Sequence, residues 1–256
     1  MNAPLPGRLA PLRDALLDAR HRHATVPADD LPIPQSDAQA YAVQQAVADA
    51  LGWFAAPGPR AWKVGAASRD AVPNAAPLPP SMIRESPATF ATQTFNRILI
   101  EGEIAFRLRV PLEGAMDAAR VAAAIDGWCV TIEIVDPRYT DMDAAAPLLR
   151  LADQGLHGAL VVGTGGSLPP NVAWKSLVAR VRRNGEVVRE THGGHPLGDP
   201  LFMLPWLARH AAQRGMPFAA GDVVTAGTWT GVLEAFPGET IEIEFPDVGR
   251  ASAHFG

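Results

Sequence analysis

The sequence predicts an α+β fold in which mixed strands close into a β-rich roll or barrel-like sandwich with N-terminal and flanking helices. Two helical segments come first along the 256-residue chain, and many short strands follow with few crossover helices between them. No internal repeat and no low-complexity linker divides the chain. We therefore expect one domain over residues 1–256, with a helical appendage at residues 1–55 and a β-rich roll at residues 56–256.

Composition narrows the possible partners and the compartment. The apolar fraction of 48% suffices for a large core, and a net charge of −5 with scattered basic residues argues against nucleic acid as a partner. The single cysteine, Cys129, lies in an apolar run and is predicted to be a small buried side chain. The N-terminus lacks a secretory-type apolar segment, and no apolar run approaches the ~18 residues of a membrane span. We therefore expect a cytoplasmic protein without a membrane partner.

The N-terminal part contains two predicted helices and a short strand. Residues 8–22 are amphipathic because four leucines share one side, namely Leu9, Leu12, Leu16 and Leu17. Ser36 and Gln39 form a capping box for a second helix, which Gly52 ends. The run RAWKVGA at residues 60–66 is then typical of a short strand.

The middle of the chain alternates loop, strand and helix. Residues 69–88 are rich in Pro and Ala, which favours an irregular surface loop or lid. A long strand follows at residues 98–110, where apolar side chains recur at every second position. Asp117 begins a short helix that leads into a second apolar strand at residues 128–136.

The C-terminal half is predicted to be mostly strands. Residues 140–155 look helical or irregular, and a buried strand and a hairpin follow, the hairpin turning at Asn184-Gly185. A helix at residues 199–215 ends at Gly215, and Pro205 near its start is expected to kink it. Turn signals divide residues 221–255 into several short strands.

Two acids, Glu101 and Glu103, lie in the long strand with only Gly102 between them. Residues two apart share a face of a strand, so the two carboxylates point the same way, with Cα atoms roughly 6.5–7 Å apart at about 3.3 Å per residue. Like charges this close repel, and a partly dry site favours a proton or a cation between them. The alternative is a solvated face on which Arg107 and Arg109 balance the acids.

A third acid, Glu133, lies in the next apolar strand, WCVTIEIVD. A buried carboxylate without a partner costs several kcal/mol, roughly, unless it is neutralised or meets a cation. Neighbouring strands could bring Glu133 to the other two acids, and sites made only of oxygen ligands suit Mg²⁺ or Mn²⁺. Zinc is disfavoured because no Cys/His cluster has suitable spacing.

Lys63 is the second candidate for chemistry, because a lysine between Trp62 and Val64 in a short apolar strand is uncommon. It either extends from a strand edge to water or faces the acids, where it could stabilise an oxyanion or carry a proton. Beside a cluster of three carboxylates the second interpretation is favoured. His192 and His195 lie in a glycine-rich segment and are interpreted as loop residues.

Six motifs together resemble a known family. They are WKVG, EGEIAF, IEIVDPR, LADQG, DPLFMLPWLA and GDVVTAGT, in an order and spacing that match from about residue 36 to the end. The resemblance is to the 2-keto-4-pentenoate hydratase group of the fumarylacetoacetate hydrolase superfamily. It implies the fold of the superfamily's C-terminal domain, a dimer or larger homo-oligomer, and a metal-dependent enzyme acting on 2-oxo acids or their dienol forms.

The matching positions also imply roles for residues. Glu101, Glu103 and Glu133 match the ligands of Mg²⁺ or Mn²⁺, and Lys63 matches the active-site lysine, so that Lys63 and Glu103 are the expected catalytic residues. The group's usual ADNAS run is ADQGL here, its SR after the third ligand is Pro137-Arg138, and the loop after WKVG lacks the group's acid. These changes affect substrate-shaping and proton-handling positions, so the resemblance leaves the exact reaction open.

The predicted chemistry begins with a 2-oxo acid whose carboxylate and C2 oxygen chelate the ion, which stabilises an enolate. Gly227, Thr228 and Thr230 in the run GTWTG are expected to hold a distal group of the substrate, or else to form a plain turn. Hydration of a conjugated alkene is the principal prediction. Decarboxylation, of the 4-oxalocrotonate decarboxylase kind, and hydrolysis of an acylpyruvate are the alternatives, the second disfavoured because YTDMD stands where hydrolases carry an ARDLQ-like run.

Two non-enzymatic interpretations also remain at this stage. The chain could be a catalytically silent metal-binding subunit that stabilises an active hydratase or decarboxylase. It could also be a purely structural β-roll without metal, in which case a chelator would change neither its melting temperature nor its ligand binding.

Overall fold

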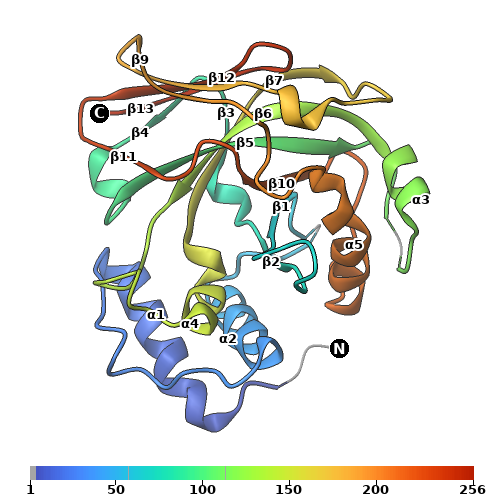
Figure 1. Ribbon diagram of the computed structural model, residues 1–256. Helices are drawn as coiled ribbons and strands as arrows, with labels where there is room; N and C mark the ends of the chain where they lie inside the picture. The colour runs from blue at the N-terminus through green and yellow to red at the C-terminus, as the bar shows by residue number, and fades with distance from the viewer. Residues whose placement is uncertain (1–3, 57, 113) are drawn as a thin grey trace.

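The computed structural model describes residues 4–56, 58–112 and 114–256, and it confirms the predicted α+β class. Two sheets pack face to face in the upper part of the view in Figure 1, and helices α1, α2 and α4 gather below them. No helix in the described ranges is long and apolar enough to cross a membrane.

The α-helices and 3₁₀ turns (η) are η1 Gly7–Leu9, α1 Ala10–Arg22, α2 Asp37–Ala50, η2 Pro80–Met82, η3 Thr92–Thr94, α3 Ala118–Ala123, α4 Pro147–Ala152, η4 Gln154–Leu156, η5 Trp174–Ser176, η6 Pro200–Met203 and α5 Leu204–Gln213. The strands are β1 Ala61–Gly65, β2 Asn74–Pro77, β3 Ile83–Glu85, β4 Ala88–Phe90, β5 Ile98–Leu108, β6 Ile125–Val135, β7 His157–Ser167, β8 Ala179–Arg183, β9 Glu186–Thr191, β10 Val223–Thr228, β11 Leu233–Ala235, β12 Thr240–Phe245 and β13 Gly249–Phe255.

The larger sheet holds eight of the described strands, in the order β2-β1-β10-β5-β6-β7-β3, with β11 pairing to one end of β5. Its centre is antiparallel, whereas β1 pairs with β10, and β3 with β7, in parallel. The smaller sheet, of five described strands, runs β4-β13-β12-β8-β9. Alternate residues of β5 and β6, such as Phe106 and Ile132, pack against Ile241 and Ile243 of the smaller sheet to form the main core.

Gly102 explains a gap in the apolar series of β5. A Cβ atom at this position would lie 2.8 Å from the side chains of both Ile243 and Thr230. Only glycine therefore lets the smaller sheet and the loop after β10 approach the part of β5 that carries the two acids.

The N-terminal helices form a second core with α4 and with the ends of β5 and β6. Leu12 and Leu16 of α1 and Val43 of α2 are fully buried in this cluster, together with Leu99 and Val135 of the two strands. The Ser36 side chain caps α2 by accepting from the Gln39 amide, as predicted, whereas the Gln39 side chain accepts from the Gln35 amide and not from the Ser36 amide that a capping box uses. The helices are thus packed on the roll, while the predicted division at residue 55 stays a prediction.

Several local predictions are confirmed. Asp117 caps α3, accepting from Arg120 N at 2.8 Å. The β8–β9 hairpin turns at Asn184-Gly185 with φ values of 52° and 89°, which a primed hairpin turn requires. Cys129 is free and 4% exposed.

Two local predictions were wrong. Residues 69–88 are not an irregular loop throughout, since they contain β2, η2 and β3, and β2 pairs with β1 by backbone bonds that Pro- and Ala-rich composition does not reveal. Pro205 does not kink a helix, because it lies in the first turn of α5, where its missing N–H is not needed. The 3₁₀ turn η6 precedes that helix as a separate element.

Candidate metal centre

Strand register brings the three predicted acids together. In the antiparallel pair of β5 and β6, Glu101 lies directly opposite Glu133, and Glu103 lies opposite Thr131. One carboxylate oxygen from each of the three acids lies within 4.8 Å of the other two. Glu103 and Glu133 are 2% and 1% exposed, and Glu101 is half-buried.

The acids occupy the face of the larger sheet that points away from the smaller sheet. Farther along the same face, beyond Thr131, lie Ala105 on β5 and Cys129 on β6, and both belong to a separate small cluster of buried apolar side chains. Like charges placed opposite each other on such a face are destabilising. The arrangement therefore needs a source of positive charge.

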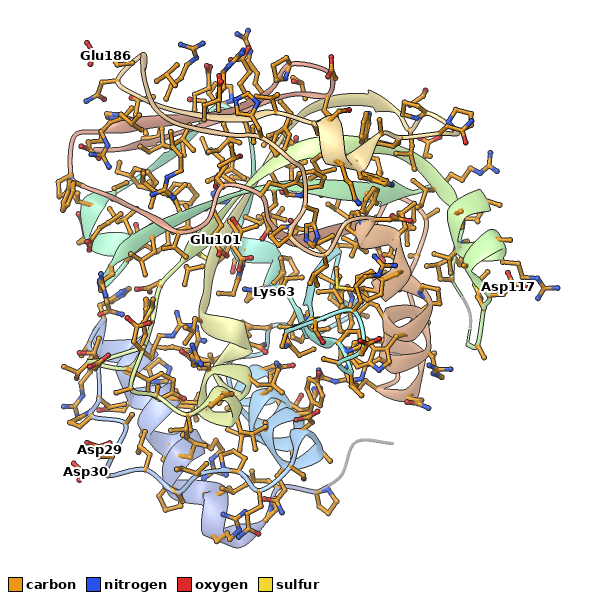
Figure 2. The ribbon with its side chains drawn as sticks, viewed as in Figure 1. Asp29, Asp30, Lys63, Glu101, Asp117 and Glu186 are labelled. Atoms are coloured by element: carbon orange, nitrogen blue, oxygen red, sulfur yellow. The ribbon has the colours of Figure 1, made fainter. Side chains whose placement is uncertain are left out.

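Lys63 supplies part of that charge from β1. Its Nζ donates to Glu133 Oε1 at 2.5 Å and to the Gly155 carbonyl at 3.0 Å. Figure 2 shows Lys63 and Glu101 close together in the middle of the molecule, below the larger sheet. Lys63 therefore faces the acids and does not extend to water. Burial of the ammonium group alone would lower the pKa of Lys63, but the nearby acids outweigh this effect and the pKa is raised.

Arginines do not balance the pair on β5. Among the described residues, no ion pair or hydrogen bond joins Arg107 or Arg109 to either acid, and the Arg109 guanidinium donates to the Ala123 carbonyl instead. The alternative of a solvated, self-balanced strand face is therefore wrong.

Glu103 is held by two donors from β10 that the sequence analysis did not identify as site residues in this role. The Thr225 hydroxyl donates to Glu103 Oε2, and the Gly227 amide donates to the same oxygen at 3.2 Å. Thr225 also contacts the Thr131 hydroxyl on β6, so three strands are joined by side chains beneath the acids. The alternation of side chains along β10 could have shown that Thr225 points toward the acids, but only once β5 was known to be the neighbouring strand.

His157, the first residue of β7, is the main residue that sequence analysis missed. Its Nδ1 lies 3.2 Å from Glu133 Oε1, and its Nε2 has no hydrogen-bond partner within the described part of the chain. Burial lowers the pKa of His157 despite the opposing effect of Glu133, so the ring is neutral at pH 7 and Nδ1 carries the proton that Glu133 accepts. By contrast, His192 is exposed beside Glu190, and His195 is buried and accepts from the Leu197 amide.

The three carboxyl groups differ in acidity because their surroundings differ. Burial, with the nearby Glu133 charge, raises the pKa of Glu101 to about 7 and raises the pKa of Glu103 well above its usual value. Burial would also raise the pKa of Glu133, but Lys63 and His157 outweigh it, and that pKa is lowered. In the protein without a metal ion, Glu133 is thus the ionised member and the others retain protons readily.

The residues fit a hard divalent cation. Three carboxylates face one ammonium group, which leaves an excess of negative charge when all are ionised. Glu133 Oε2 is buried and accepts no hydrogen bond from any described residue, while its other oxygen is used by Lys63 and His157. A buried carboxylate oxygen without a partner, in an all-oxygen set, is what a Mg²⁺ or Mn²⁺ site requires.

A cavity of about 360 Å³ opens beside the acids. Lys63, Glu101 and the Gly155 backbone form the end at the candidate metal centre, and Leu151 and Leu156 contribute apolar wall. Leu156 stands where the resembled group has Ser. Gln154, which replaces Asn, is 1% exposed, and neither of its amide atoms has a hydrogen-bond partner in the described ranges.

The run GTWTG lies beside the acids, and some of its polar groups already form hydrogen bonds within the protein. The Thr230 hydroxyl accepts from the Gly102 amide at 2.9 Å and donates to the Gly231 carbonyl. Thr228 pairs with Glu103 in the β10–β5 register, and its hydroxyl oxygen is buried without a partner among residues that are described. The predicted substrate contacts of Gly227, Thr228 and Thr230 stay predictions.

The contribution of Glu101 to the stability of the metal-free protein is expected to fall as pH rises from about 5 to about 8. The pKa of Glu101 is about 7 in the folded chain against 4.5 for the ordinary group, so its contribution is complete below 4.5 and is lost as pH rises through 7. Melting temperatures in a chelator, compared between wild type and Glu101→Gln across this range, measure the effect. If the two proteins show parallel profiles, the raised pKa of Glu101 is contradicted.

Comparison with known proteins gives a family match over most of the chain. The family described as fumarylacetoacetate (FAA) hydrolase C-terminal matches residues 60–255. A 4-oxalocrotonate decarboxylase of Pseudomonas putida is 31% identical over 157 residues, which cover 61% of this chain and 59% of that protein. A 2-keto-4-pentenoate hydratase of Paraburkholderia xenovorans LB400 is 28% identical over 157 residues, or 61% of this chain and 58% of the relative. The chain thus matches about three fifths of the length of these curated relatives.

Among solved structures, 4-oxalocrotonate decarboxylase from Pseudomonas putida G7, complexed with magnesium and adipate, has a TM-score of 0.82 against this chain. The two are 24% identical, and the alignment covers 99% of this chain and 100% of the other. At this identity the likeness shows the fold. Together these matches confirm the resemblance carried by the six motifs.

Proposed function

Because the chain belongs to the fumarylacetoacetate hydrolase family, we propose that it is a divalent-metal-dependent lyase acting on a 2-oxo acid or its dienol form, and specifically a hydratase of the 2-keto-4-pentenoate type. The proposal rests on one observation, that oxygens of Glu101, Glu103 and Glu133 lie within 4.8 Å of one another. These three carboxylates are the proposed ligands, and the ion is Mg²⁺ or Mn²⁺.

The bound ion would supply Lewis-acid stabilisation of the negative charge that develops on the C2 oxygen of a 2-oxo acid. The residues of the chain prepare the place for that charge. Lys63 presents an ammonium group at the end of the cavity and holds Glu133, while Thr225 and Gly227 hold Glu103. Because these bonds exist before substrate binds, little reorganisation is needed during the reaction. Leu151 and Leu156 give the cavity an apolar wall.

Decarboxylation is the second candidate function, and two residues in or next to the cavity wall support it. Leu156 lines that wall and replaces the hydroxyl of the resembled group. The buried Gln154, two residues earlier, replaces the shorter amide, and loss of CO₂ needs no residue to deliver water. A named relative, the decarboxylase of Pseudomonas putida, belongs to this class. Acylpyruvate hydrolysis has no comparable support.

The test is turnover by the purified protein with Mg²⁺, with Mn²⁺, and with a chelator. Hydration of 2-keto-4-pentenoate, or of a related unsaturated 2-oxo acid with a second carboxylate, without CO₂ release supports the hydratase. CO₂ release from 4-oxalocrotonate or oxaloacetate supports the decarboxylase. A protein that binds Mg²⁺ but turns over none of these acids would be the silent metal-binding subunit. If added Mg²⁺ and chelator leave the melting temperature unchanged, the metal centre itself is refuted.

The remaining parts of the proposal concern compartment and assembly. We place the protein in the cytoplasm, because its single cysteine allows no disulfide within the chain, which is usual for proteins of a reducing compartment. A homo-oligomer is proposed because the resembled group forms dimers or larger assemblies. Sedimentation at several protein concentrations tests the second point.

His157→Ala is expected to weaken Mg²⁺ binding by roughly 10- to 100-fold, which is the usual effect of removing a group that orients a ligand. The reason is that Glu133 Oε1 loses one of its two side-chain donors, so Oε2 is no longer held toward the other acids. Mg²⁺ titration by calorimetry measures the loss. His157→Asn, which keeps an N–H donor near Nδ1, should retain most of the affinity, and His192→Ala is the control at an exposed histidine. Equal affinity in wild type and His157→Ala would contradict the orienting role.

A further inference from the structure

The cavity beside the acids is lined by a second positively charged side chain, to which the proposed function gives no role. Of the described residues that line it, two are positively charged, namely Lys63 and Arg150. Lys63 is engaged with Glu133 and Gly155. Arg150 lies on α4, which forms another part of the wall, and is half-buried.

The guanidinium group of Arg150 has no partner among the residues that the structure describes. Neither a hydrogen bond nor an ion pair joins its side chain to any other residue of the described ranges. Most of the nearby lining is apolar, including Met142, Pro147 and Leu151. A fork of donors in a largely apolar wall is suited to one small group, a carboxylate, which it can bind with two parallel hydrogen bonds.

The backbone that carries Arg150 is well anchored relative to the candidate metal centre. The Arg150 amide donates to Ala146 O at 3.2 Å, and the Tyr139 hydroxyl donates to Leu149 O at 2.7 Å within α4. The turn after the helix is bonded to the site itself, since Lys63 Nζ donates to the Gly155 carbonyl. The helix therefore holds Arg150 in a defined place along the cavity that begins at Lys63 and Glu101.

We infer that Arg150 binds a second, distal carboxylate of the substrate. The substrate is accordingly a 2-oxo dicarboxylic acid, and not 2-keto-4-pentenoate itself, which has a single carboxylate. This inference rests on the proposed function, in which the 2-oxo acid end of the molecule lies at the three glutamates. A volume of about 360 Å³ is within the range of small-molecule sites, about 300–1,000 Å³, so the cavity has room for a short chain between the two ends. Arg150 is thus a specificity-determining residue in the wall of the cavity that Lys63 and Glu101 also line.

Calorimetric binding of two matched probes, 2-oxoadipate and 2-oxohexanoate, in the presence of Mg²⁺ tests the inference without requiring turnover. The probes share a six-carbon chain and differ in the distal carboxylate. Wild type is expected to bind 2-oxoadipate roughly tenfold to a hundredfold more tightly, as a charge-assisted contact predicts. Arg150→Met should lose this preference and keep its affinity for 2-oxohexanoate. Arg209→Met, at an exposed arginine of α5 outside the cavity, should keep the preference.

The outcomes separate the two proposals. Equal affinity of wild type for both probes, or an unchanged preference in Arg150→Met, overturns the role of Arg150 and leaves the metal-dependent function standing. Failure of wild type to bind either probe with Mg²⁺ overturns the inference together with the function on which it rests. Equal affinity of wild type for both probes overturns the inference even if Arg150→Met does not fold.

Discussion

Glu103→Gln is expected to lose at least ~100-fold in metal-dependent turnover while the fold survives, because removing even an orienting neighbour of a metal ligand costs roughly 10- to 100-fold. The amide oxygen of Gln can still accept from Thr225 and from the Gly227 amide, so the local structure should persist. The variant also removes a buried acid whose pKa is raised by burial and by Glu133. The metal-free variant should therefore melt at the same temperature as wild type or higher, whereas the rise in melting temperature on adding Mg²⁺ should nearly disappear.

Glu186→Gln is the matched control for this experiment. Glu186 is an exposed acid at the start of β9, far from Glu101 in Figure 2, and the same change of charge there should alter neither turnover nor the response to Mg²⁺. Full activity in Glu103→Gln would refute the assignment of this residue as a ligand. A lower melting temperature of the metal-free variant would instead show that repulsion among the acids is not significant.

Lys63→Met is expected to have the second large effect, on both stability and rate. Glu133 would lose its only cationic partner in the described structure, and breaking a buried ion pair on one side typically costs about 3–5 kcal/mol in the free energy of unfolding. Mg²⁺ should restore part of this loss, because the ion also neutralises Glu133. The value of kcat should fall by roughly 10²- to 10³-fold, as when a positioned donor to a developing oxyanion is removed. Denaturant unfolding with and without Mg²⁺, and steady-state kinetics, measure the two effects.

The chain offers a close control, since it contains two lysines and both occur in the triplet Ala-Trp-Lys. Lys175 is exposed in η5, so Lys175→Met removes the same charge in the same local sequence without contact to the acids. If Lys63→Met keeps its stability in a chelator, the ion pair with Glu133 does not hold in solution. If it is destabilised but retains wild-type kcat in Mg²⁺, Lys63 is a structural residue and not a catalytic one.

Much of the fold could be predicted from local patterns. The period of two in β5 and β6, the caps at Ser36 and Asp117, and the Asn184-Gly185 turn each depend on residues within one element. The predictions that failed concerned pairing between distant segments. β2 is a strand because β1 lies beside it, and no property of a Pro- and Ala-rich run reveals that neighbour.

The candidate site divides in the same way. Alternation alone placed Glu101 and Glu103 on one face, and an acid or lysine within an apolar strand marked Glu133 and Lys63. The contribution of His157 was not predictable. It is the first residue after a glycine-containing turn, and no alternation of side chains before it indicates which way its ring points. Arg150 was likewise not indicated by the sequence, because arginines are common in the chain and usually lie on exposed surfaces of helices.

The sequence by itself determined which side chains are chemically unusual, because burial of a charged residue in an apolar strand is costly wherever that strand lies. It also determined the spacing of the two acids on β5, which follows from the geometry of any extended chain. Only the tertiary structure decided that Glu101 lies opposite Glu133, that His157 and Lys63 share one oxygen of Glu133, and that Arg150 faces the same cavity. Those relations depend on strand register and helix packing between residues far apart in the chain, which local periodicity does not specify.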